Sequence, residues 1–197
     1  MTVTFWFDPS CPFTWRTGQW LRSVAEARGE QVRWRLMSLA TLNADKELSA
    51  KHEERLRQAQ LASRVLAATE AAHGSAGLDA VYAALGKRVH EQGQDLGRAT
   101  VEAALGEAGL PGALLAAYDD EQPDAAVLTS HDESQQRVGE EAGSPVVAFG
   151  DGPGFFGPIV TDVPTAEAAD RLYEAVRLLS SVAEFSELKR ARRPAGS

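Results

Sequence analysis

The sequence has 197 residues, of which 44% are hydrophobic and 24% are charged, and its formal net charge at pH 7 is −8. This composition is typical of a globular protein that buries a core, and it excludes a disordered chain. The negative charge disfavours nucleic acid and anionic lipid surfaces as partners. No apolar run reaches the roughly 18 residues that a membrane span needs. We therefore expect one domain with an insertion and no nucleic-acid or membrane partner.

The N-terminal part predicts a strand, a helix and a second strand. Residues 3–7 form a short apolar run rich in aromatic and β-branched side chains, which is typical of a buried strand. Residues 12–28 place apolar side chains at helical spacing, with Pro12 near the first helical position and Gly29 at the end. Residues 32–36 alternate between apolar and charged side chains, which indicates a strand with one buried face.

The central part, residues 39–142, shows no strand pattern. It is rich in Ala, Leu, Glu and Gln, which favour helices. We expect several helices here, interrupted at glycine-containing positions: His73-Gly74, Gly77, Gly93, Gly97 and residues 109–112.

The C-terminal part predicts an antiparallel hairpin and a last helix. Residues 145–149 and 155–159 flank a glycine-rich turn, and Pro164 is expected to open the helix. The glycines of this segment superficially resemble a phosphate-binding loop, but they join two strands and no helix follows at once. The whole pattern predicts an α/β protein with a thioredoxin fold, formed by residues 1–38 and 143–197, that carries an all-helical insertion at residues 39–142.

Cys11 is the single cysteine of the chain. No intramolecular disulfide is therefore possible, as expected in a reducing compartment, and residues 1–7 run directly into a strand pattern without the features of a signal peptide. These observations predict a cytoplasmic protein.

The position of Cys11 suggests a reactive thiol. A cysteine at the start of a helix directs its sulfur toward unpaired backbone N–H groups and the positive end of the helix dipole, which favour the thiolate. The alternative is a small buried hydrophobic residue, the usual role of a lone cysteine. The strand-turn-helix context favours the reactive interpretation. Asp8, close before it, either caps the turn or shuttles a proton, and we favour the turn.

The segment FWFDPSCPFTW, residues 5–15, resembles the FWFDPxCPWCW opening of actinobacterial DsbA-like proteins, a group that includes the mycothiol-dependent nitroreductases. Similar strings occur at residues 37–43, 86–93, 143–145 and 155–158. The resemblance implies a thioredoxin fold with a helical lid, exchange chemistry with disulfides or small thiols, and a homodimer. It also implies a cis-proline loop at Ser144-Pro145 that faces the cysteine.

The chain departs from this group at Thr14, where the group carries a resolving cysteine. Thr14 cannot close a disulfide with Cys11, so monothiol chemistry with a low-molecular-weight thiol such as mycothiol is expected, without a tightly bound cofactor. Thr14 is also expected to donate its hydroxyl to the Cys11 thiolate. The second substrate is expected to be small and apolar or electrophilic. The predicted catalytic residues are Cys11 and Thr14, and the predicted substrate-binding residues are Pro12, Phe13, Trp15, His90, Ser144 and Pro145.

Two other functional classes stay open. Kappa-type glutathione transferases and hydroxychromene-carboxylate isomerases share this architecture and also lack the cysteine pair, so a transferase or isomerase is the first alternative. A binding module without catalysis is the second. His90 either lines the pocket between lid and core or lies on a helix surface. The remaining histidines lack partners at ligand spacing, so no metal site is predicted.

Overall fold

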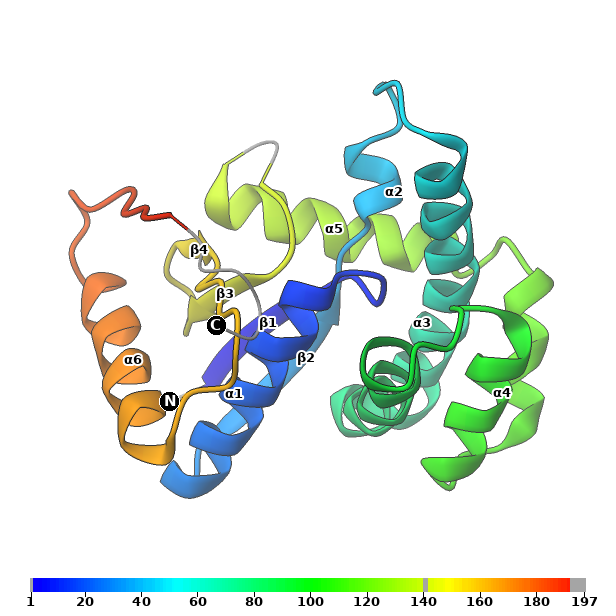
Figure 1. Cartoon of the computed structure of the whole chain (residues 1–197), viewed down its shortest axis with the longest axis horizontal. Helices are drawn as coiled ribbons and strands as arrows, with labels where there is room; N and C mark the ends of the chain where they lie inside the picture. Colours follow the sequence, from blue (N-terminus) through cyan, green and yellow to red (C-terminus); the bar gives the residue numbers. More distant parts are fainter. Residues whose placement is uncertain (1, 140–141, 192–197) are drawn as a thin grey trace.

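The computed structural model describes residues 2–139 and 142–191. Figure 1 shows the sheet between α6 on one side and the helices α3 and α4 on the other. In chain order the elements are β1 (Thr2–Phe7), α1 (Pro12–Arg28), β2 (Gln31–Leu36), α2 (Leu39–Leu42), α3 (Ala50–Gly86), the π-helical turn η1 (Lys87–Glu91), α4 (Arg98–Glu107), the 3-10 helix η2 (Gly112–Asp119), α5 (Asp124–Val138), β3 (Val146–Phe149), β4 (Gly154–Phe156) and α6 (Ala166–Leu179).

The four strands lie in the order β2-β1-β3-β4. β1 runs parallel to β2, with Phe7 opposite Leu36, and antiparallel to β3, with Trp6 opposite Val146. β3 and β4 form the predicted antiparallel hairpin. A β-α-β unit and a β-β-α unit thus share one sheet, and the predicted thioredoxin fold of α/β class is confirmed.

Both faces of β1 are covered. Alternate residues of a strand point to opposite faces of the sheet, and Phe5 and Phe7 enter the main core with α1 and α3. Trp6 points the other way, into a smaller cluster with Met37, Val146 and Ala148, against which Val138 of α5 packs. Residues 3–7 are buried as a result. The turn that follows β1 and carries Cys11 is therefore attached to a fixed strand.

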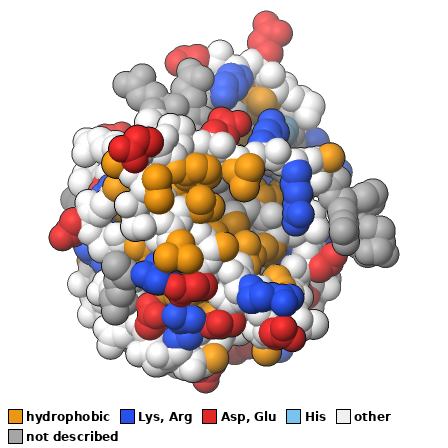
Figure 2. All heavy atoms as spheres, turned by 90° about the vertical axis from the view of Figure 1, so that its left-hand side faces the viewer, with side chains coloured by type: hydrophobic (Ala, Val, Ile, Leu, Met, Phe, Trp, Pro, Cys, Tyr) orange, Lys and Arg blue, Asp and Glu red, His pale blue; other side chains and the backbone are white. Residues whose placement is uncertain are grey.

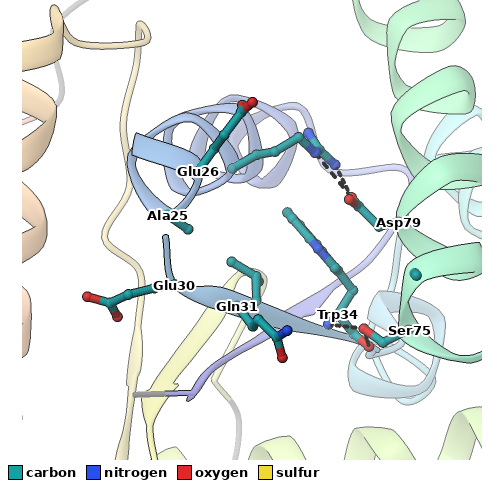
Figure 3. A pocket seen from close by; sticks show the side chains of 10 residues that line it. Ala25, Glu26, Glu30, Gln31, Trp34, Ser75 and Asp79 are labelled. Atoms are coloured by element: carbon teal, nitrogen blue, oxygen red, sulfur yellow. Dashed lines mark hydrogen bonds and ion pairs between the residues drawn. The ribbon is translucent and has the colours of Figure 1, made fainter. Parts of the chain in front are cut away.

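The long helix α3 is kinked at Gly74, whose φ of 68° is readily accessible only to glycine. The predicted interruption at Gly77 is wrong, because this residue lies inside α3. A Cβ atom there would lie 2.5 Å from Cβ of His73, so this glycine provides room beside the kink instead of ending the helix. Just after the kink, Ser75 Oγ accepts the backbone N–H of Trp34 at 2.7 Å on the edge strand β2 (Figure 3).

A cavity of about 470 Å³ lies beside this contact, between α1, β2 and α3 (Figure 3). Two of its charged groups bind one another, because Arg22 pairs with Asp79, and the Arg22 guanidinium carbon lies 4.6 Å from the centre of the Trp34 ring. The cavity adjoins the C-terminal half of α1, whereas Cys11 precedes the first residue of that helix. We assign no chemistry to it.

Two boundaries near the C-terminus differ from the prediction. The last strand ends at Phe156 instead of residue 159, because the chain turns at Gly157 with a φ of 107°, a value that L side chains rarely adopt. Helix α6 begins at Ala166, with Thr165 as its extended N-cap, and not at Pro164. It packs on α1, where the indole N–H of Trp20 donates to the Ala169 carbonyl at 3.1 Å.

The limits of the helical insertion stay a prediction. α5 was expected to belong to it, yet α5 contacts the end of β2: the Ser130 hydroxyl donates to the Leu36 carbonyl at 2.6 Å. The backbone N–H of Ser38 also donates to Nδ1 of His131 at 3.3 Å. We propose that the insertion ends before α5 and that α5 covers one face of the sheet. No helix among the described residues is long and apolar enough to cross a membrane.

Candidate functional site

Cys11 is the N-cap of α1, with extended backbone angles (φ −86°, ψ 115°), and Pro12 occupies the first turn. The backbone N–H of Cys11 donates to the Asp8 carbonyl at 3.2 Å, and its carbonyl accepts the N–H of Trp15 at 3.1 Å. The thiol is half-buried, and no other cysteine exists in the chain. The predicted placement of the thiol at a helix start is confirmed.

The Ser144-Pro145 peptide bond is cis, as the resemblance implied. This loop faces the thiol, because Sγ of Cys11 lies 3.7 Å from the Ser144 carbonyl oxygen and donates to it. The Ser144 hydroxyl accepts the backbone N–H of Asp8 at 3.0 Å. The loop is thus bonded both to the sulfur and to the turn before it. A second cis bond, Gly157-Pro158, was not predicted.

Thr14 points at this loop. Its Oγ1 lies 2.8 Å from Oγ of Ser144, and both side chains are buried. The expected hydrogen bond from Thr14 to the Cys11 sulfur is therefore replaced by a bond to the Ser144 hydroxyl. The reason is geometric: the serine is on a distant segment that sequence spacing does not bring near. The predicted catalytic role of Thr14 stays a prediction.

Asp8 is 1% exposed and organises the turn, as we favoured. Its Oδ1 accepts the backbone N–H and the hydroxyl of Ser10, at 2.8 and 2.6 Å. Its Oδ2 accepts the N–H of Leu39 at 2.7 Å, at the start of α2. Burial raises the pKa of this carboxyl, and the hydrogen bonds from Ser10 and Leu39 oppose that rise. Asp8 thus ties the Cys11 turn to the chain that follows β2.

His90, in η1, contacts the same turn. Its Nε2 lies 2.9 Å from the Pro9 carbonyl oxygen, which can only accept, so Nε2 carries the proton. Burial lowers the pKa of His90 to about 4, so the ring is neutral at pH 7. His90 therefore supports the turn as a neutral donor. Its proposed contact with substrate stays a prediction.

Trp15 is 5% exposed, so little of its ring is open to a substrate. Its indole N–H donates to Glu91 at 3.2 Å, and its ring stacks on His90 with centres 6.1 Å apart. The observed contacts of Trp15 are thus with η1, and its predicted contact with substrate stays a prediction. Of the other predicted binding residues, Pro12 is exposed and Phe13 is half-buried, and both follow Cys11 directly in the chain.

A cleft of about 300 Å³ opens beside the sulfur. Most of this cleft was not predicted from the sequence. It forms where the start of α3 lies next to the start of α1, and these two segments are far apart in the chain. Arg55 shows the connection: its guanidinium donates to the carbonyl of Ser10, one residue before the cysteine. The lining residues are Ser10, Cys11, Pro12, Leu39, Ser49, Lys51, His52, Arg55 and Leu56. The signal in the sequence that points to this cleft is a pair of basic residues four apart, Lys51 and Arg55, which lie on one side of the helix that Ser49 caps.

The described part of the chain contains no group of three or more His, Cys, Asp or Glu residues that could hold a metal ion.

A family model described as "Rv2466c-like: Mycothiol-dependent nitroreductase Rv2466c" matches residues 10–190, which include the thiol, Thr14, His90 and the cis-proline loop. The chain belongs to this family. The "Uncharacterized protein Rv2286c" of Mycobacterium tuberculosis is 32% identical to this chain over 197 residues, covering 98% of the chain and 84% of that protein. The predicted relationship to actinobacterial DsbA-like, thiol-dependent oxidoreductases is confirmed.

Solved structures with the same fold are more distant in sequence. The cytosolic disulfide reductase DsbM from Pseudomonas aeruginosa has a TM-score of 0.58 at 20% identity, covering 90% of this chain and 100% of its own. The same reductase with GSH gives 0.58 at 18% identity, covering 89% and 98%. A 2-hydroxychromene-2-carboxylate isomerase gives 0.63 at 16% identity, covering 92% and 95%. At these identities the comparisons show the fold alone.

Proposed function

We propose that this member of the Rv2466c-like family catalyses thiol-disulfide exchange with Cys11 as its only nucleophilic thiol. The observation that carries the proposal is the position of the Cys11 sulfur, at the start of α1 and 3.7 Å from the carbonyl of the cis-proline loop. Thr14 stands where a resolving cysteine would, and the chain has one cysteine in total. An internal disulfide cannot form, so a second thiol molecule has to complete the cycle.

The cycle has two displacements. The Cys11 thiolate attacks one sulfur of a disulfide, the S–S bond of that disulfide breaks, and one half leaves as a thiolate while the other half stays bonded to Cys11. A small thiolate then attacks the bound half, forms a new disulfide with it and releases the Cys11 thiolate. One half of the first disulfide is released as a thiolate, and the small thiol ends in a mixed disulfide with the other half, so electrons balance without a bound cofactor.

The low-molecular-weight thiol is the expected cosubstrate. The family model is named for a mycothiol-dependent enzyme, and one structural neighbour was solved with GSH. We propose mycothiol or a similar thiol as the reductant, and a small disulfide or another small electrophile as its co-substrate. A cytoplasmic location is part of this proposal, because a reduced thiol pool is required.

We also propose a homodimer. Figure 2 shows hydrophobic side chains gathered on the face that carries α6. The large apolar side chains exposed in this C-terminal part of the chain are Phe156, Val163, Leu178, Val182 and Leu188. Exposed apolar patches commonly mark interaction sites. Light scattering coupled to size-exclusion chromatography measures the mass: twice the 21.1 kDa of the chain supports the dimer, and a monomer at all concentrations contradicts it.

An isomerase or transferase is the second candidate. The 2-hydroxychromene-2-carboxylate isomerase has the higher TM-score of the neighbours described above, 0.63 against 0.58. In this alternative a bound thiol supplies the chemistry, and Cys11 helps to bind it.

Intact-mass spectrometry tests the proposal. The native protein is mixed with oxidised mycothiol and, separately, oxidised glutathione, and the urea-unfolded chain and Cys11→Ser serve as controls. We expect one thiol adduct per chain, formed faster in the native than in the unfolded protein, absent from Cys11→Ser and removed by excess reduced thiol. Equal rates in native and unfolded chains contradict the proposal. Thiol-dependent isomerisation that survives in Cys11→Ser supports the second candidate.

A further inference from the structure

The cleft beside Cys11 is positively charged in a chain whose net charge is −8. Two of its lining side chains, Lys51 and Arg55, are cationic, and His52 adds a ring N–H donor. No carboxylate is among the described residues that line it. Such a basic entrance attracts anions that the rest of the surface repels.

Among the described residues, the carboxylates near this cleft do not line it, and only the buried Asp8 offsets part of the charge of Arg55, which attracts it. Glu54 accepts hydrogen bonds from Arg57 and from Gln58. Asp8 is buried beneath the turn, where Ser10 and Leu39 satisfy its oxygens. Glu53 is exposed and does not line the cleft.

The positive charge is also held in place. The guanidinium of Arg55 donates to the carbonyl of Ser10, so it cannot swing away from the cysteine without breaking that bond. Two helices begin at the same cleft: Cys11 caps α1, and Ser49 caps the part of α3 that precedes the Gly74 kink. Figure 1 shows the start of α3 above the turn that leads into α1. The positive ends of both helix dipoles add to the attraction for an anion.

We infer that the cleft binds a carboxylate or similar anionic group of the disulfide substrate, and that this group places the substrate sulfur against Cys11. The inference rests on the proposed exchange activity and adds a substrate class to it. A volume of about 300 Å³ fits one half of a small disulfide. In the reaction the Cys11 thiolate bonds to the sulfur whose chain carries the anion, and the other half leaves as a thiolate.

Three symmetric disulfides of similar size test the inference: 3,3′-dithiodipropionate, which is anionic, bis(2-hydroxyethyl) disulfide, which is neutral, and cystamine, which is cationic. Intact mass gives the rate of adduct formation at Cys11, and each rate is divided by the rate of the same reagent with the unfolded chain. We expect the anionic reagent to react about tenfold faster than the neutral one after this correction, with cystamine slowest. Added salt should reduce the difference.

Lys51→Gln, alone or combined with His52→Gln, should lower the ratio of the corrected rate with the anionic disulfide to that with the neutral one. Both side chains are exposed, so these changes leave the core intact. Lys87→Gln removes the same charge from an exposed residue outside the cleft and should keep the ratio. Equal corrected rates for the three reagents, or a ratio that Lys51→Gln leaves unchanged, overturn the inference while fold-dependent reaction with the neutral disulfide still supports the exchange activity. Absence of fold-dependent reaction with all three overturns both.

Discussion

The side-chain oxygens of Thr14 and Ser144 lie 2.8 Å apart, and this hydrogen bond joins the first turn of α1 to the cis-proline loop. The Ser144 hydroxyl also accepts the backbone N–H of Asp8 at 3.0 Å. All three residues are buried. Beneath the half-buried sulfur there is thus a small polar network, which holds the turn and the loop at a fixed separation.

This network predicts unequal costs for removing its two hydroxyls. Thr14→Val leaves Ser144 bonded to Asp8, so we expect a loss of about 1 kcal/mol in the free energy of unfolding. Ser144→Ala leaves both the Asp8 N–H and the Thr14 hydroxyl without this partner, and a loss of about 2–3 kcal/mol is expected. Urea unfolding measures both. Thr129→Val, at an exposed position of α5, is the control and should change stability by less than about 0.5 kcal/mol. A cost for Ser144→Ala no larger than that for Thr14→Val contradicts the network.

Thr14→Cys should convert the protein from a monothiol to a dithiol protein. Residues three apart on a helix place their Cβ atoms about 5–6 Å apart, and a modest adjustment at a helix start brings two sulfurs into bonding distance. After mild oxidation we expect an internal disulfide between Cys11 and the introduced thiol, seen as the loss of both free thiols and of two hydrogens from the mass. The mixed disulfide with a small thiol should then be short-lived, because the second cysteine resolves it. Two thiols that stay free under these conditions contradict the expected geometry.

His90 should make the protein sensitive to acid. Its pKa is 6.5 in the unfolded chain and about 4 in the folded protein, so between these values the unfolded state binds more protons. The neutral His90 ring makes its full contribution to the free energy of unfolding above pH 6.5. This contribution is lost as the pH falls toward 4, and the loss reaches up to about 3 kcal/mol. His90→Gln keeps an N–H donor for the Pro9 carbonyl but does not titrate. The stability advantage of the native protein over this variant should shrink from about pH 7.5 to about pH 4. A pH-independent difference contradicts the buried, neutral ring.

Local patterns were sufficient to predict the elements that carry the thiol. The apolar run of residues 3–7, Pro12 at the first helical position and Gly29 at the end gave α1 its observed bounds, Pro12–Arg28. These signals work because strand burial, helix capping and the left-handed Gly29 depend on neighbours in the sequence. The resemblance supplied the cis Ser144-Pro145 bond, which spacing alone would not justify.

The contacts between distant segments could not be predicted in the same way. Arg55 meets Ser10, Ser144 meets Thr14 and His90 meets Pro9 only after α3 and the C-terminal hairpin have packed on the sheet. Each contact depends on how whole elements are placed relative to one another. The hydrophobic periodicity of a single segment predicts which of its faces is buried, but not which distant segment packs there. Gly77 shows the same limit: as a residue type it favours a break, but its role is decided by the His73 side chain that lies over it.

Gly86, the last residue of α3, should tolerate no side chain. A Cβ atom there would overlap Cε3 of Trp15, whose indole is held by Glu91 and stacked on His90. Gly86→Ala should therefore displace the ring and lower the free energy of unfolding by about 1–3 kcal/mol. It should also slow adduct formation at Cys11, because Trp15 lies in α1, the helix that Cys11 caps. Gly106→Ala is the matched control: this glycine is also helical, nothing lies within 4 Å of its added Cβ, and replacement should stabilise the protein by about 0.5–1 kcal/mol. Thermal unfolding and intact mass measure the two effects. A Gly86→Ala variant as stable and as reactive as Gly106→Ala would mean that Trp15 moves aside freely, and that η1 does not hold the thiol-bearing helix in place.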